Sequence, residues 1–267
     1  MHHLLNAFRR KQGPKDRRFP VTMKMLRWLA GCVNFNDDFD ATVFHASVFG
    51  WFFMTRVSEL LVETPKDEHE DPGFRYSDVA LLTKGDQVFW NPGSWKTGGW
   101  WQTMTGRWVE PPDSVAVKFR RTKVDKYGGA AVRLHGRSQD GDICPVGAAV
   151  YVEKRSPGKR HMGGNTPFWE FASGRPVKRT DIQAAVKAMV AQAGLPTRQG
   201  NTHSLRIGGA TALYAAVRDM EVVKRWGRWR GDVAHLYVWD ERSTMQNDAR
   251  SMATAGSDVV AFMSEMR

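Results

Sequence analysis

The feature that most limits the fold is a change in sequence pattern near Tyr76, where helical periodicity is replaced by short segments rich in β-forming residues. Helical periodicity dominates before this point and resumes after about residue 145. A sequence that runs from helices to a small sheet and back, without βαβ alternation, is typical of an α+β domain, and the short strands favour an antiparallel sheet. The expected strands are residues 79–82, 87–90, 115–119 and 131–134, separated by turn residues at 84–86 and 128–129.

The flanking helices follow from apolar spacing and capping signals. Met25, Leu26, Leu29 and Val33 share one helical face after Pro20. A second apolar helix is expected over residues 39–54, and Ser58 is a candidate N-cap for a short third one. After the sheet, helices are expected at residues 146–154, 180–193, 203–217, 221–226, 233–239 and 258–266.

Composition narrows the class of partner. The chain has 267 residues and a formal net charge of +11, and a basic surplus of this size indicates a polyanionic partner. The longest apolar stretch, residues 48–54, is far short of the roughly 20 residues of a membrane-spanning helix, so no membrane role is expected. Two cysteines, Cys32 and Cys144, give no disulfide framework and fit a reducing, intracellular compartment.

Two further segments stand out by composition. Residues 1–19 are polar and basic, which predicts either a linker or arm or a solvated tail. Residues 90–108 hold five of the eleven tryptophans, together with Lys96 and Arg107. These rings either stack on nucleic-acid bases or, as is more common for a tryptophan cluster, belong to the core or cover a sheet face.

Residues 202–211 carry the chemistry. His203 and Arg206 are three residues apart, so they lie on one face of a helix that begins near Thr202. A guanidinium offers a planar fork of donors to two phosphate oxygens. Tyr237 follows 31 residues after Arg206 and supplies a phenol, which is a candidate nucleophile. The pattern predicts phosphodiester chemistry.

With five blocks in the same order, the chain resembles the catalytic domain of the tyrosine recombinase (phage integrase) family. Its motifs are most similar to those of the DIRS-like and Crypton-like recombinases of mobile elements. The blocks are Arg56 with Glu59, Lys123 within the basic residues 121–126, His203 with Arg206, residues 207–211, and Gly227-Arg228-Trp229 followed by Tyr237.

The resemblance implies a role for each residue. Arg56 and Arg206 hold the two non-bridging oxygens of a DNA phosphate, with His203 as a further donor or proton acceptor. Tyr237 forms a 3′-phosphotyrosyl intermediate, and Lys123 protonates the leaving 5′-oxygen, although Lys118 and Lys126 lie nearby. Guanidinium charge stabilises the transition state, so neither a cofactor nor a metal is expected.

One block departs from the family pattern. The family's His or Trp directly follows the glycine, nine positions before the nucleophile; here that position is Arg228 and the tryptophan comes next, as Trp229. We favour Trp229 as the catalytic aromatic. Direct DNA contacts are expected from the basic residues Arg120, Arg121, Lys126, Arg228 and Arg230.

The resemblance also predicts organisation and partners. Residues 20–267 form the catalytic domain, whose C-terminal helix at 258–266 docks on a neighbouring protomer, and residues 1–19 link it to a missing DNA-clamping domain. The partner is double-stranded DNA, bound by a dimer or tetramer, in the nucleus of a eukaryote or otherwise in the cytoplasm or nucleoid. Two alternatives fit the same residues: a type IB topoisomerase, and a DNA-binding protein that no longer cuts.

Overall fold

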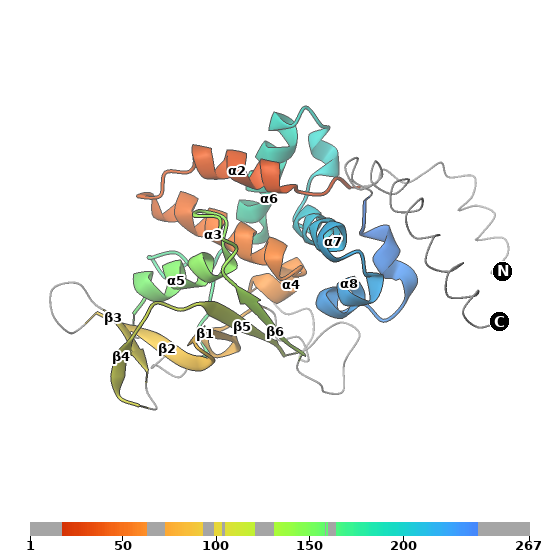
Figure 1. The fold of residues 1–267 in the computed structure, drawn as a ribbon. Helices are drawn as coiled ribbons and strands as arrows, with labels where there is room; N and C mark the ends of the chain where they lie inside the picture. The colour runs from red at the N-terminus through yellow and green to blue at the C-terminus, as the bar shows by residue number, and fades with distance from the viewer. Residues whose placement is uncertain are drawn as a thin grey trace, which may run out of the picture.

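The computed structural model describes residues 18–62, 73–92, 99–102, 105–120, 131–157, 159 and 164–239. It confirms the α+β class, with a body of helices above one antiparallel sheet (Figure 1). Among these residues, none of the helices has the length and apolarity needed to cross a membrane. The helices are α2 (Met23–Cys32), α3 (Asp38–Phe52), α4 (Val57–Leu60), α5 (Pro145–Arg155), α6 (Arg179–Gln192), α7 (His203–Val217) and α8 (Met220–Gly227).

The sheet has the strand order β4-β3-β2-β1-β5-β6, and every neighbouring pair is antiparallel. The four predicted strands are confirmed as β1, β2, β5 and β6. The other two were not predicted, and they extend the sheet by a hairpin at the β2 edge. The strands are β1 (Val79–Thr83), β2 (Asp86–Asn91), β3 (Gly99–Gln102), β4 (Arg107–Val109), β5 (Ser114–Phe119) and β6 (Ala131–Gly136).

Helix α5 lies between the sheet and α3, so it joins the two layers (Figure 1). Alternate residues of β1 and β5, such as Leu81 and Val117, point into this layer and are fully or almost fully buried. Helix α3 is buried on nearly all sides because α2, α5, α6 and α7 surround it. This explains why its sequence shows no polar face.

Helix starts follow the predicted patterns with one correction. The side chains of Thr22 and Asp37 cap α2 and α3 by accepting backbone N–H bonds from Met25 and Asp40. Helix α4, in contrast, begins at Val57 with Arg56 as its N-cap, so the prediction of Ser58 as N-cap is wrong.

The helix expected at residues 233–239 is a 3₁₀ segment, η3 (Asp232–Leu236). A left-handed Arg228 and Gly231, a glycine with a positive φ of 150°, separate it from α8, so the chain turns sharply there. The helix expected at 258–266 and the arm at 1–17 lie outside the described residues.

The tryptophan-rich segment divides between the two faces of the sheet. Trp100 is 5% exposed and makes an edge contact with Trp90, over which the Lys154 ammonium of α5 lies at 4.5 Å. On the other face, Trp101 and Trp108 are paired across β3 and β4 with ring centroids 5.1 Å apart, and Trp108 is 47% exposed. The core interpretation therefore holds for the inner face of the sheet.

Two glycines let α7 approach its neighbours closely. A Cβ on Gly208 would lie 1.9 Å from the carbonyl oxygen of Val21, and one on Gly209 would lie 2.1 Å from that of Trp51. Because both obstacles are backbone atoms, side-chain rearrangement cannot relieve them. The Trp51 indole N–H also donates to Val21 at 2.7 Å, which ties α3 to the chain entering α2.

We therefore expect Gly209→Ala to lower the free energy of unfolding by about 1–3 kcal/mol, the usual cost of overpacking. Urea denaturation monitored by circular dichroism measures the change. The matched control is Gly31→Ala in α2, where a Cβ meets nothing within 4 Å and alanine's helix propensity favours the variant. Equal stability of the two variants would contradict the close approach.

Candidate active site

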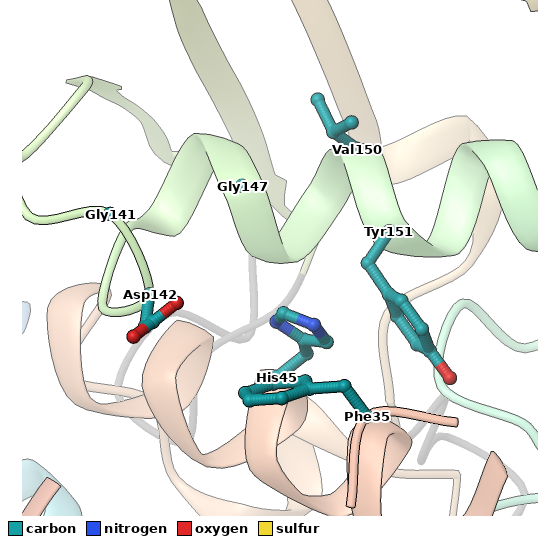
Figure 2. Close-up of a pocket in the computed structure, with 7 residues that line it drawn as sticks. All are labelled: Phe35, His45, Gly141, Asp142, Gly147, Val150 and Tyr151. Atoms are coloured by element: carbon teal, nitrogen blue, oxygen red, sulfur yellow. The ribbon is translucent and has the colours of Figure 1, made fainter. Parts of the chain in front are cut away.

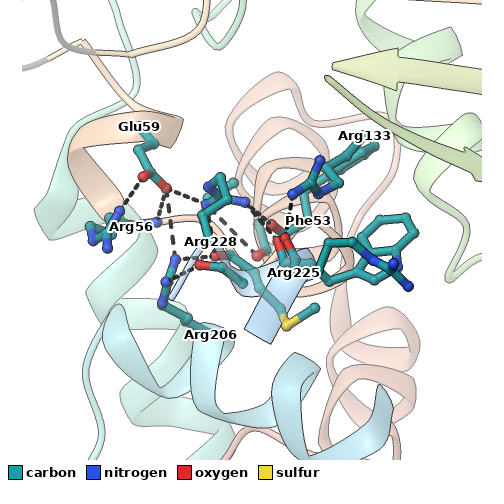
Figure 3. Close-up of polar contacts among 12 residues, drawn as sticks. Phe53, Arg56, Glu59, Arg133, Arg206, Arg225 and Arg228 are labelled. Atoms are coloured by element: carbon teal, nitrogen blue, oxygen red, sulfur yellow. Dashed lines mark hydrogen bonds and ion pairs between the residues drawn. The ribbon is translucent and has the colours of Figure 1, made fainter. Parts of the chain in front are cut away.

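Three segments that are far apart in sequence meet beside the start of α7 (Figure 3). Arg56 and Glu59 come from the turn into α4, His203 and Arg206 from the first turn of α7, and Arg228 from the end of α8. Hydrogen bonds and ion pairs join them into one network, which we call the arginine cluster: Arg56, Glu59, Arg206 and Arg228.

The carboxylate of Glu59 is the centre of the arginine cluster. Its Oε1 accepts from Nη1 of Arg56 at 2.5 Å, and its Oε2 accepts from the backbone N–H of Arg56 at 2.7 Å. The same Oε2 accepts from Nη2 of Arg228 at 2.6 Å and lies 3.8 Å from Nη1 of Arg206. Three guanidinium groups thus share one carboxylate, which leaves a net charge of +2 for an anion.

Arg206 is fully buried, with 0% of its surface exposed. Its two terminal nitrogens donate to the backbone carbonyls of Met54 and Gly227. The indole of Trp229 lies over its guanidinium at 4.3 Å, and the ring of Tyr237 lies at 5.7 Å. In this arrangement the Arg206 guanidinium is covered and is not exposed to a phosphate in solution.

The turn at the end of α8 sends neighbouring side chains in different directions. Arg228 has a left-handed backbone with φ 60°, and its side chain is 4% exposed. A Cβ on Gly227 would lie 1.7 Å from the ring of Trp229, so only glycine leaves room for that ring. Arg228 therefore faces Glu59, while Trp229 faces Arg206.

Tyr237 lies among the predicted catalytic residues. Its ring centroid is 5.0 Å from that of His203, in an edge contact, and 4.7 Å from that of Trp229. Thr211 of α7 holds its backbone: the hydroxyl donates to the Tyr237 carbonyl at 3.3 Å and accepts from the Trp239 N–H at 3.2 Å. Within the described part of the chain, no hydrogen bond engages the Tyr237 phenol oxygen.

Burial and charge set the protonation states. Burial alone would raise the pKa of Glu59, but the surrounding arginines, Arg228 first, outweigh it and hold the pKa below its ordinary value. Burial lowers the pKa of Arg206 to about 9, with Glu59 acting in the opposite direction. Both groups are therefore ionised at neutral pH.

His203 is held neutral. Burial lowers the pKa of its imidazole to about 4, and the positive charges of Arg206, Arg18 and Arg56 act in the same direction. A neutral imidazole next to the ring of Tyr237 can accept a proton.

Two of the remaining predicted residues are described by the structure. Arg120 forms an ion pair with Asp78 at 2.9 Å and donates to the carbonyl of Gly73, and Arg230 is exposed. Arg121, Lys123 and Lys126 lie outside the described residues.

The strands on either side of residues 121–130 both contact the end of α8. The Arg228 guanidinium lies 3.6 Å from the ring centroid of Phe119, the last residue of β5. Arg133 of β6 donates to the carbonyl of Arg225 (Figure 3). The chain that carries Lys123 therefore leaves and re-enters the sheet beside α8.

Sequence reasoning missed three contributions. Glu59 was noted as the partner of Arg56 but not as the centre of three arginines. Thr211, within the Gly-Gly-Ala-Thr run, anchors the tyrosine segment, and Phe119 supports Arg228. Only Thr211 had a usable signal, a polar residue between the apolar Ala210 and Ala212.

A separate pocket of about 290 Å³ lies between α3 and α5 (Figure 2). His45 lines it, stacked on Tyr151 at 4.3 Å, and burial lowers the pKa of this histidine to about 4. Asp142 lines it as well, but no arginine or lysine does. The pocket therefore lacks the cations that a phosphate requires, and the arginine cluster remains the candidate active site.

Comparisons with known proteins support the fold. No family model and no curated protein matches the chain. Two crystal structures of the site-specific recombinase XerH bound to difH substrates are similar to it, with TM-scores of 0.54 and 0.50 at 13% and 10% identity. They cover 87% and 89% of this chain but 53% and 56% of XerH, so the chain spans about half of that protein. The Tn1549 transposon integrase bound to DNA matches with a TM-score of 0.46 at 14% identity.

The chain therefore has the fold of a tyrosine recombinase catalytic domain. The DIRS-like or Crypton-like subtype, the oligomeric state and the site residues stay predictions.

We expect His203 to remain neutral well below the pH at which a solvated histidine titrates. Its folded pKa of about 4 lies below the ordinary histidine value of 6.5, so the stability contributed by the neutral ring is present above about pH 6.5. That contribution is lost as the pH falls through about 4. Histidine ring NMR across pH 4–8 measures the titration, and His203→Gln identifies the signal by its loss. A midpoint near 6.5 would show that the ring is solvated.

Proposed function

We propose that this chain is the catalytic domain of a site-specific DNA recombinase or integrase that cleaves and rejoins DNA through a 3′-phosphotyrosyl intermediate. The observation that carries the proposal is the convergence of one phenol, one neutral imidazole and a net-positive group of arginines from three distant segments. The net charge of +11 supports a nucleic-acid partner.

In the proposed reaction, the Tyr237 oxygen attacks a DNA phosphorus and passes its proton to neutral His203, 5.0 Å away between ring centroids. The phosphorus–5′-oxygen bond breaks, and the 5′-oxygen leaves as a hydroxyl with a proton from Lys123. Arg56 and Arg206 stabilise the charge on the non-bridging oxygens. Attack by another 5′-hydroxyl reverses these steps and rejoins the strand.

Trp229 fits the family's aromatic position better than Arg228 does. Its ring contacts both Tyr237 and Arg206, whereas the Arg228 guanidinium is turned towards Glu59. We infer that Trp229 borders the bound phosphate once the ring has moved from Arg206.

A second candidate function has its own support. With Arg206 buried and both terminal nitrogens bonded to backbone carbonyls, a chain in which this closure persists would bind DNA without cutting it. Exposed basic residues such as Arg230 would serve either function. Detection of a covalent adduct separates the two.

The adduct test uses a pool of nicked duplexes with randomised sequence around the nick. We expect the wild-type chain to form a covalent adduct that survives denaturing electrophoresis, and sequencing of the trapped DNA to yield a preferred site. Tyr237→Phe removes the nucleophile but keeps the ring contacts, so the adduct is expected to fall by on the order of 10³-fold or more.

Tyr214→Phe is the matched control, because this tyrosine lies further along α7 and contacts Arg218. An adduct in Tyr237→Phe would overturn the assignment of the nucleophile. Tight DNA binding by wild type without any adduct would favour the non-cutting protein. Relaxation of supercoiled plasmid without sequence preference would favour a type IB topoisomerase.

The role of Lys123 is tested with a leaving group that needs no proton. Lys123→Ala is expected to slow cleavage by on the order of 10²-fold, the usual contribution of a general acid. A substrate with sulfur in place of the 5′-bridging oxygen should restore the rate, because a thiolate is a far better leaving group than an alkoxide. Lys118→Ala and Lys126→Ala serve as controls. If the sulfur substrate rescues Lys118→Ala or Lys126→Ala but not Lys123→Ala, the rescued position is the general acid instead.

A further inference from the structure

Arg228 occupies an unusual position for a charged residue. It closes α8 in the left-handed backbone region, where glycine is the common choice and a side chain is strained. The glycine of this turn is one residue earlier, where the ring of Trp229 requires it. Arg228 is therefore strained and buried at the same time. The contacts of its side chain indicate which interaction offsets the strain.

The Arg228 side chain contacts groups in the protein interior. The two terminal nitrogens of Arg228 donate to the carbonyls of Phe53, Met54 and Trp226 at 3.1–3.3 Å. Its shortest bond, 2.6 Å, goes to Oε2 of Glu59. One face of the guanidinium lies on the ring of Phe119 at 3.6 Å. A side chain that is 4% exposed and engaged in this way is not available to a DNA backbone.

The bond between Arg228 and Glu59 determines which arginines the Glu59 carboxylate pairs with. Arg228 holds Oε2 at 2.6 Å and Arg56 holds Oε1 at 2.5 Å, whereas Arg206 is 3.8 Å from Oε2. A buried carboxylate needs cationic partners. Without Arg228, the nearest replacement is Arg206, and a closer pair with Glu59 would withdraw its charge from a phosphate.

We propose that Arg228 is a positioning residue that orients Glu59, and through it Arg56, and leaves the charge of Arg206 for the scissile phosphate. This inference rests on the proposed function. Its contact with Phe119, at the end of β5, also connects the arginine cluster to the strand that leads to Lys123.

The test compares cleavage rate with DNA affinity, using full-length chain and the DNA site recovered in the adduct assay. Arg228→Met keeps most of the side-chain volume and removes the charge. We expect single-turnover cleavage at saturating DNA to fall by about 10²-fold, as for a misplaced catalytic group. The dissociation constant and its salt dependence should remain within about twofold of wild type, because no phosphate contact is lost.

Rescue distinguishes positioning from a general loss of structure. Glu59→Gln removes the charge that Arg228 balances, so the double variant Arg228→Met/Glu59→Gln should cleave at least about tenfold faster than Arg228→Met alone. Arg228→Lys keeps a cation without the planar fork and should fall between wild type and Arg228→Met. If Arg228→Met does not fold, the lysine and double variants carry the same comparison. Arg27→Met, whose side chain is 63% exposed on α2, is the control for loss of an arginine.

The outcomes separate the two proposals. If wild type forms no adduct, the proposed function fails and this inference falls with it. If wild type cleaves and Arg228→Met cleaves equally fast, only the positioning role is refuted. Weaker DNA binding, a salt slope reduced by about one and no rescue by Glu59→Gln would show that Arg228 contacts a phosphate instead.

Discussion

The site depends on one buried carboxylate. Glu59 accepts from Arg56 and Arg228 and lies near Arg206, so it joins the ends of α4 and α8 to the start of α7. Without Glu59, the positive charges of the three arginines would repel one another strongly in this buried setting. The negative charge of Glu59 reduces this repulsion and lets them lie close together. Its charge is too small to neutralise all of them, and the surplus is the property that a phosphate-binding site needs.

Backbone proximity places Arg206 within reach of that carboxylate. Gly208 and Gly209 allow α7 to lie against the carbonyls of Val21 and Trp51, with no room for a Cβ at either position. At this depth the Arg206 guanidinium meets the carbonyls of Met54 and Gly227. The two glycines that follow Arg206 thus have a structural role, because they bring α7 close enough for the Arg206 guanidinium to be fully buried.

Local patterns allowed much of this to be predicted from the sequence. Spacing of three residues indicated that His203 and Arg206 share a face, and both contact the ring of Tyr237. Strands β3 and β4 were missed because their short Gly- and Trp-rich segments show no clear alternation. The inward turn of Arg228 was missed as well, because it depends on a left-handed backbone and on a ring that occupies the space beside Gly227.

The turn at Gly227-Arg228-Trp229 accounts for the departure from the family pattern in physical terms. Since the left-handed backbone at Arg228 directs that side chain to Glu59, the residue after it is the one that faces Arg206. The aromatic residue, Trp229, thus stands one position later than in the family pattern but lies next to Tyr237 in space. Arg228, which stands at the position of the family's His or Trp, balances the Glu59 carboxylate from inside the protein. The direction of the backbone at Arg228, rather than position in the sequence, thus determines which of the two side chains faces Arg206.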